Sequence, residues 1–98
     1  TAPLQAWNEA RRQHARRYNR LLAGTGLVLP VERPDCQAVY HVYAVRTPRR
    51  DEVLARLQAA GVGAAIHYPL PLHLQPAWQH LGYRPGDFPV AEACARSV

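Results

Sequence analysis

The chain has 98 residues and a formal net charge of +5, and all twelve of its basic residues are arginine. This length allows a single domain with a modest core and excludes a large, complete enzyme. The absence of lysine excludes Schiff-base chemistry by this chain alone, because that chemistry needs a lysine amine.

An amphipathic helix is predicted for residues 3–23. Its apolar residues fall on one side of a wheel with about 3.6 residues per turn, and Arg12, Arg16 and Arg20 form a column on the other side. Gly24 suits the end of this helix. The arginine column has two interpretations, a solvated face or a contact with an acidic partner such as nucleic acid. We favour the solvated face, because neither interleaved aromatic residues nor a glycine-rich loop accompanies the arginines.

A loop and a β-strand are predicted next. Residues 25–38 contain two prolines and a glycine around a short apolar stretch, which is typical of a loop with at most a brief strand. Residues 39–46 are rich in β-branched and aromatic side chains, which predicts a strand. We expect His41, on one face of this strand, to be a packed histidine rather than a ligand.

A second helix and a second strand follow. Thr47 and Pro48 predict the first residues of a helix that ends at Gly61, with two acidic residues in its first turn. The apolar residues 62–66 then predict a strand. For two strands joined by a helix, the crossover rule favours a parallel pair.

Residues 67–78, with the sequence HYPLPLHLQPAW, carry three prolines. Each proline removes a backbone donor and fixes its own φ, so no regular helix or strand fits this stretch. We expect a stiff, extended loop, and such loops often carry the side chains that contact ligands. After it we predict a short helix over residues 76–81 ended by Gly82, a turn over 84–87, and a last helix over 88–96 capped by Asp87.

Two ordered motifs lie in the second half of the chain. One has the form GV-x4-HYP-x-PLH-x-Q over residues 61–75, and the other reads LGY-x-x-GDFP-x-AE over residues 81–92. Both resemble motifs of the DegT/DnrJ/StrS family of sugar aminotransferases. Residues 7–18, 40–43 and 50–51 resemble a helix, a strand and a helix start of the same family, so the resemblance covers nearly the whole chain.

The resemblance implies an α+β fold, in which a small, mainly antiparallel sheet is covered by helices. This is the C-terminal subdomain of a fold-type I aminotransferase. The antiparallel sheet disagrees with the parallel pair that the crossover rule favours, and we follow the resemblance. Residues 1–24 are then a connecting helix and residues 25–98 a sheet-and-helix subdomain of one small domain. We expect a domain that binds the cofactor to precede Thr1, and a further strand and helix to follow Val98.

The resemblance also implies a function for the parent enzyme. It is expected to hold pyridoxal phosphate on a lysine outside this chain and to act as a homodimer. It would transfer an amino group, from glutamate as the expected donor, to a nucleotide-linked keto-sugar. We expect neither a catalytic nor a cofactor-binding residue within these 98 residues. The alternative is a non-catalytic binding or regulatory module that uses the arginine face on an acidic partner.

Four residues of the proline-rich loop are the candidate substrate contacts. The resemblance implies that Tyr68 and His73, with His67 and Gln75 beside them, line a cleft shared with the cofactor domain. Imidazole, phenol and amide groups can all hydrogen-bond to sugar hydroxyls or diphosphate oxygens. The other interpretation of these residues, that they cap the sheet and satisfy buried backbone groups, stays open.

We expect neither a metal site, nor a redox-active cysteine motif, nor a membrane-spanning segment. His67, His73 and His80 have a wider spacing than zinc ligands usually show. Cys36 and Cys94 are far apart and form no C-x-x-C motif. The sequence has no apolar run of the roughly 20 residues that a membrane span needs, so we expect a soluble, cytoplasmic protein without a nucleic-acid partner.

Overall fold

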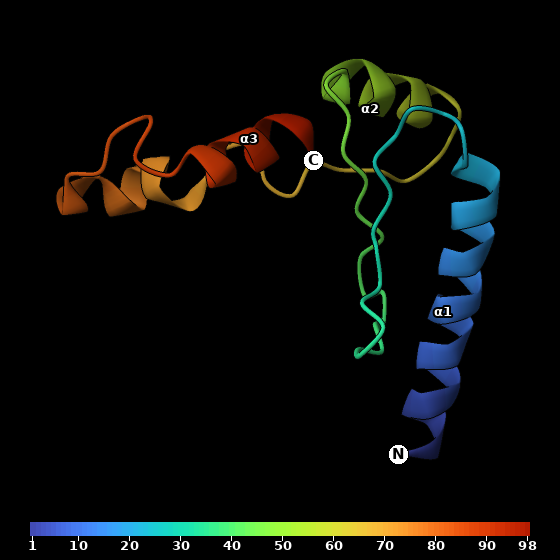
Figure 1. Ribbon diagram of the computed structural model, residues 1–98. Helices are drawn as coiled ribbons and strands as arrows, with labels where there is room; N and C mark the ends of the chain where they lie inside the picture. Colours follow the sequence, from blue (N-terminus) through green and yellow to red (C-terminus); the bar gives the residue numbers. More distant parts are fainter. The chain divides into compact units, whose positions relative to one another are not determined.

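The computed structural model describes residues 1–98 and consists of helices joined by loops (Figure 1). The elements in chain order are α1 (Ala2–Leu22), α2 (Arg50–Ala59), the 3₁₀ helices η1 (Leu72–Leu74) and η2 (Pro76–Leu81), and α3 (Pro89–Ser97). The chain divides into two compact units, residues 1–45 and 46–98. The division at residue 24 that the sequence suggests stays a prediction. No helix in the structure combines the length and the apolar character that crossing a bilayer requires.

The first unit consists of α1 and the loop that follows it. The predicted helix is confirmed, with Pro3 in its first turn. Arg12 connects the helix to the loop by hydrogen bonds. Its guanidinium donates to Glu32 Oε1 at 3.0 Å and to the carbonyl oxygen of Ala38 at 2.7 Å. Glu32 in turn accepts hydrogen bonds from the Ala38 amide and the Tyr40 hydroxyl. These contacts hold the pKa of Glu32 below its ordinary value, and the hydrogen bond from Arg12 is the largest cause.

Aromatic packing completes the first unit. The rings of Tyr18 and Tyr43 lie 5.0 Å apart, and the Tyr43 hydroxyl donates to Asn19 Oδ1 at 2.6 Å. Tyr18 and Asn19 belong to α1, whereas Tyr43 belongs to the loop. Packing and hydrogen bonding therefore fix the loop at a second place along the helix.

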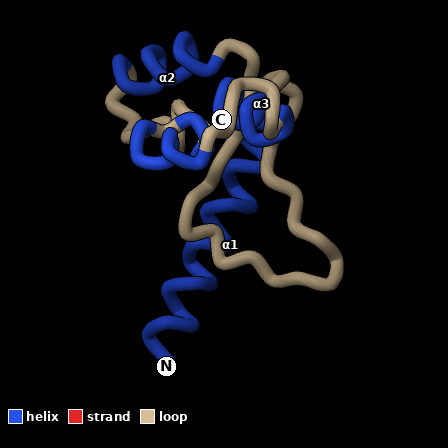
Figure 2. The backbone as a smooth tube through the Cα atoms, turned by 90° about the vertical axis from the view of Figure 1, so that its left-hand side faces the viewer, coloured by secondary structure: helices blue, strands red, loops and turns tan.

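The predicted strands over residues 39–46 and 62–66 are wrong, because the structure contains no β-strand. The chain between α1 and α2 is drawn entirely as loop in Figure 2, and it contains only isolated bridge residues, Val28 and Arg46. Tyr40 has a positive φ of 50°, which interrupts the extended backbone in the middle of residues 39–46. β-propensity describes residues that suit a sheet, but a strand also needs a continuous ladder of hydrogen bonds to a neighbour, and this chain forms none.

The second helix begins two residues later than predicted, at Arg50. Pro48 lies outside the helix, and the Thr47 hydroxyl accepts a hydrogen bond from the amide of Arg49 at 3.2 Å. The predicted end at Gly61 is confirmed. Gly61 has a φ of +76°, and the amide of Val62 bonds back to the Leu57 carbonyl, which is the pattern of a Schellman motif. Val62 thus completes the helix end, which is a further reason why no strand begins there.

The second unit joins the start of α2 to the end of α3. The amide of Thr47, whose side chain is buried, donates to the Ser97 carbonyl at 2.8 Å. The guanidinium of Arg50 donates to the Ala95 carbonyl. Both donors satisfy carbonyls in the last turns of α3, and the positive charge of Arg50 is favourable at that end of a helix.

Two details of this unit differ from the sequence prediction. The predicted short helix over residues 76–81 forms, but as the 3₁₀ helix η2, which ends at Gly82 with a φ of +76°. The last helix α3 begins at Pro89, and its N-cap position is Phe88 without a side-chain cap. Asp87 does not cap it, because its Oδ2 accepts from the Arg84 amide at 2.8 Å and so closes the turn instead.

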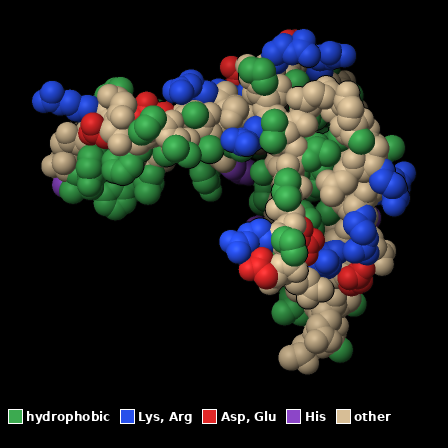
Figure 3. Space-filling model, viewed as in Figure 1, with side chains coloured by type: hydrophobic (Ala, Val, Ile, Leu, Met, Phe, Trp, Pro, Cys, Tyr) green, Lys and Arg blue, Asp and Glu red, His purple; other side chains and the backbone are tan.

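The chain buries very little apolar surface. Its only buried apolar residues are Ala15 and Ala95, whereas large side chains such as Trp7 (62 % exposed) and Leu21 (65 % exposed) face solvent. Figure 3 shows hydrophobic side chains gathered openly over the region of η2 and α3. Large apolar patches on a surface mark places that other parts of a protein cover.

Candidate functional site

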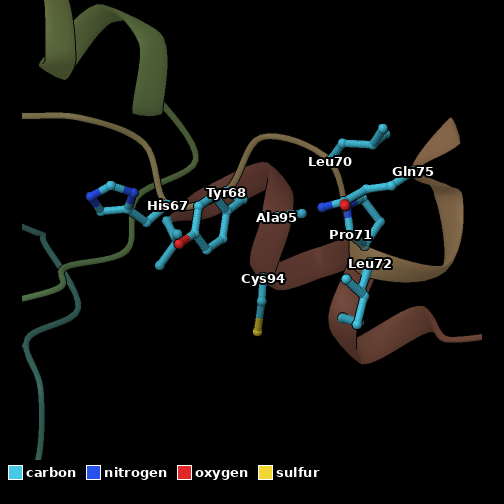
Figure 4. Close-up of a pocket in the computed structure, with 10 residues that line it drawn as sticks. His67, Tyr68, Leu70, Pro71, Leu72, Gln75, Cys94 and Ala95 are labelled. Carbon is cyan, nitrogen blue, oxygen red and sulfur yellow. The ribbon is translucent and has the colours of Figure 1, made fainter. Parts of the chain in front are cut away.

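The second unit contains an open pocket of ≈ 680 Å³ with two walls (Figure 4). One wall is the proline-rich loop after residue 66, and the other is α3 and the residue after it. The loop contributes His67, Tyr68, Leu70, Pro71, Leu72 and Gln75, and the other wall contributes Ala91, Cys94, Ala95 and Val98.

Three of the four predicted contact residues line this pocket. Tyr68 is 68 % exposed, and Figure 4 shows its ring lying against α3 near Ala95. The ring of His67 meets that of Tyr68 edge to face, with 5.2 Å between centroids. Gln75 lies further along the same wall. The pocket therefore presents a phenol, an imidazole and an amide, all of which can hydrogen-bond to a polar ligand.

The loop holds these side chains through local turns. Pro71 and Gln75, on either side of η1, have extended backbone with φ near −64° and −70°. Between them, the amides of Leu74 and Gln75 donate to the carbonyls of Pro71 and Leu72. The predicted loop thus contains one 3₁₀ turn where extended backbone was expected, and its stiffness stays a prediction.

The fourth predicted contact, His73, faces elsewhere. Its Nε2 lies 3.1 Å from Glu92 Oε1, and the two side chains are only 7 % and 12 % exposed. The His73 ring packs on Phe88, with 4.8 Å between centroids. It lines a separate, almost wholly apolar pocket of ≈ 400 Å³ with Trp78, Leu81 and Tyr83 among its neighbours. Direct contact between His73 and a substrate stays a prediction.

Glu92 joins three segments of the second unit. Its Oε1 accepts from the Gly86 amide at 2.7 Å as well as pairing with His73. These contacts hold the pKa of the Glu92 carboxyl below 4.5, with the Gly86 hydrogen bond as the largest cause and the His73 hydrogen bond next among the causes that lower it. The sequence does not indicate this role of Glu92, because its partner His73 lies nineteen residues earlier in the chain.

The lowered pKa of Glu92 gives an expected pH dependence. A carboxyl whose pKa is lower in the folded than in the unfolded state stabilises the fold above its unfolded pKa, here about 4.5. That contribution is lost as pH falls through the lower folded-state pKa. We therefore expect Glu92→Gln to lower the free energy of unfolding of the full-length protein above about pH 5, and this effect should shrink as the pH falls through the folded-state pKa. Chemical unfolding measured across this range tests it.

The matched control is Glu52→Gln, on the exposed surface of α2. It should leave the acid dependence of unfolding as in the wild type. An acid dependence that is identical in wild type and Glu92→Gln would show that Glu92 contributes nothing through its charge.

Comparison with known proteins identifies the family. The profile of the DegT/DnrJ/EryC1/StrS aminotransferase family matches residues 2–98. The chain belongs to this family. It is 45 % identical over 98 residues to a pleiotropic regulatory protein of Geobacillus stearothermophilus, covering 97 % of this chain and 26 % of the relative. It is 44 % identical to a dTDP-3-amino-3,4,6-trideoxy-alpha-D-glucose transaminase of Streptomyces venezuelae, covering 99 % and 26 %.

A solved structure supports the same assignment. The crystal structure of S. venezuelae DesV in complex with a ketimine intermediate matches this chain with a TM-score of 0.93 and 43 % identity. The match covers 98 % of this chain and 26 % of DesV. The chain thus has the fold of one part of a fold-type I aminotransferase, and it spans about a quarter of the length of the relatives it matches.

Aminotransferases of the DegT/DnrJ/EryC1/StrS family are in general pyridoxal phosphate enzymes. The residues of this chain do not fit that cofactor by themselves. The chain has no lysine to carry the cofactor, and no arginine lines either pocket to bind its phosphate. His, Cys, Asp and Glu side chains do not gather in a group that would hold a metal ion.

The helical wall of the pocket was missed by sequence reasoning. Ala91, Cys94 and Ala95 stand three and four residues apart, so they share one face of α3. This spacing was available in the sequence. It did not indicate a site, because the same spacing is typical of any helix that packs against its own protein.

Proposed function

We propose that this chain is the small C-terminal domain of a pyridoxal phosphate-dependent sugar aminotransferase. The whole enzyme would transfer an amino group, with glutamate as donor, to a nucleotide-linked keto-sugar. The observation that carries the proposal is that His67, Tyr68 and Gln75, all from one family motif, line one open pocket. Relatives named as transaminases of dTDP- and UDP-linked sugars support the substrate class.

In this proposal the pocket forms one side of the substrate site. The remainder of the enzyme would supply the opposite side and the cofactor. The Tyr68 hydroxyl makes no hydrogen bond within this chain, so it is free to bind a sugar hydroxyl or a diphosphate oxygen. His67 and Gln75 would add further hydrogen bonds from the same wall. The proline-braced loop would hold these groups in place before binding, which reduces the entropy lost when the substrate binds.

We also propose that the whole enzyme is a homodimer in which α1 packs against the cofactor domain. The exposed side chains of Trp7 and Leu21 on α1 support a partner surface there. The location of the protein in the cytoplasm stays a prediction from the sequence.

The structure does not favour the alternative of a binding module that uses an arginine face. Arg12 pairs with Glu32 at 3.0 Å, and Arg16 pairs with Glu9 at 2.6 Å. Two of the three arginines in the column therefore already have their charge compensated. Only Arg20 lacks such a pair, and one exposed charge adds little to the binding of a polyanion.

The first half of the reaction tests the proposed enzyme. The full-length protein, prepared with pyridoxal phosphate, should convert glutamate to 2-oxoglutarate in an amount equal to its active sites when no keto-sugar is present. Failure to convert any amino donor would contradict the proposed function.

A further inference from the structure

The two walls of the pocket are joined by one hydrogen bond. The loop, residues 67–75, contacts α3 through His73 Nε2 and Glu92 Oε1, which lie 3.1 Å apart. No other hydrogen bond in the structure runs between residues 67–75 and α3. The width of the pocket therefore depends on this pair and on the packing around it.

The His73–Glu92 pair also lies where it can fix the position of the loop relative to α3. Both side chains are largely withdrawn from solvent, and the His73 ring packs on Phe88, next to the start of α3. Glu92 is fixed in its turn by the Gly86 amide at 2.7 Å. On the loop side, His73 lies in the middle of η1, directly between the pocket residues Leu72 and Gln75.

The His73 ring is already hydrogen-bonded to Glu92, which argues against direct contact between His73 and a substrate. His73 Nε2 is hydrogen-bonded to Glu92, and a ligand that took this nitrogen would remove one of the two hydrogen bonds of a largely buried carboxylate. The ring also lines the neighbouring apolar pocket rather than the one that holds Tyr68.

We propose that His73 is a positioning residue, which acts through Glu92 to set the distance between the two walls of the pocket. In this role it places Tyr68 and Gln75 relative to the substrate without contacting the substrate itself. The substrate in this inference is that of the proposed function, but the mechanical coupling between loop and helix does not depend on it.

A double-mutant cycle in the full-length enzyme tests the coupling. His73→Ala and Glu92→Ala should each lower kcat/KM for the keto-sugar on the order of 10- to 100-fold, because displacements of about 1 Å have effects of this size. The double variant should be no worse than Glu92→Ala alone, because Glu92→Ala already removes the pair with His73 together with the Gly86 hydrogen bond. Effects that multiply in the double variant would overturn the proposal, because His73 would then act independently of Glu92.

A conservative variant separates positioning from contact. In His73→Gln the side-chain amide can take the place of Nε2 and donate to Glu92, although it cannot reproduce imidazole contacts. We expect His73→Gln to recover most of the kcat/KM that His73→Ala loses, and most of the recovery should be in KM. An equal loss in both variants, with wild-type melting temperatures, would overturn the proposal. His14→Ala, on the exposed surface of α1, is the matched control and should behave as the wild type.

Hydrogen exchange gives a readout that does not need activity. In the full-length protein, His73→Ala should speed amide exchange both in residues 72–75 and at Gly86, whereas His73→Gln should not. Faster exchange in the loop alone would overturn the proposal, because Glu92 would then not couple the two segments. If the enzyme transfers no amino group but this exchange pattern holds, the proposed function fails while the positioning role stands.

Discussion

Replacing Tyr68 by phenylalanine in the full-length enzyme is expected to lower kcat/KM for the keto-sugar about 5- to 150-fold. This range corresponds to about 1 to 3 kcal/mol for one hydrogen bond lost in the transition state. Tyr68 is a largely exposed aromatic side chain of the pocket, and its hydroxyl has no partner within the chain. The melting temperature should therefore stay within error of the wild type. Steady-state kinetics and a thermal unfolding curve on the same preparation measure both effects.

The control for this change is Tyr83→Phe. Tyr83 is also an exposed tyrosine of the second unit, but it lines the apolar pocket beside Phe88 rather than the pocket that holds Tyr68. It should keep wild-type kinetics. If Tyr68→Phe instead lowers stability while activity per folded molecule is unchanged, Tyr68 is a structural residue and not a substrate contact.

The second large effect concerns the chain on its own. The isolated 98-residue chain is expected to self-associate or to unfold without a sharp transition, because its buried apolar residues are only Ala15 and Ala95. Burial of apolar surface is the main favourable term in folding, and two alanines contribute little of it. Sedimentation and thermal melts at several concentrations measure this. A monomer with a sharp melting transition that is independent of concentration would contradict it.

The sequence could predict some elements of the fold and not others. The helices were found because their signals are local: a repeat of 3.6 residues in α1, and the glycines that end α2 and η2. The predicted strands were wrong, because a strand depends on a neighbour that the sequence pattern does not show. The positive φ of Tyr40 has no signal in residue type, since tyrosine rarely adopts it.

The residues of the candidate site also divide into those that the sequence could group and those that it could not. Tyr68, His67 and Gln75 follow one another closely in a rigid segment, so the spacing within a single motif is enough to group them. The partner of His73 is Glu92, nineteen residues further along the chain. Only tertiary structure shows that this pair joins the loop to α3 and that His73 lies outside the pocket that holds Tyr68.

We propose that this domain belongs to an enzyme that moves nitrogen from an amino acid to a nucleotide-linked keto-sugar. The most direct measurement follows the nitrogen itself, with ¹⁵N-labelled glutamate, the full-length enzyme, pyridoxal phosphate and a panel of dTDP- and UDP-linked keto-sugars. We expect mass spectrometry to show ¹⁵N in the amino-sugar product of at least one of them, with one 2-oxoglutarate formed for each label transferred. Release of 2-oxoglutarate without label in any sugar, across the whole panel, would contradict the account.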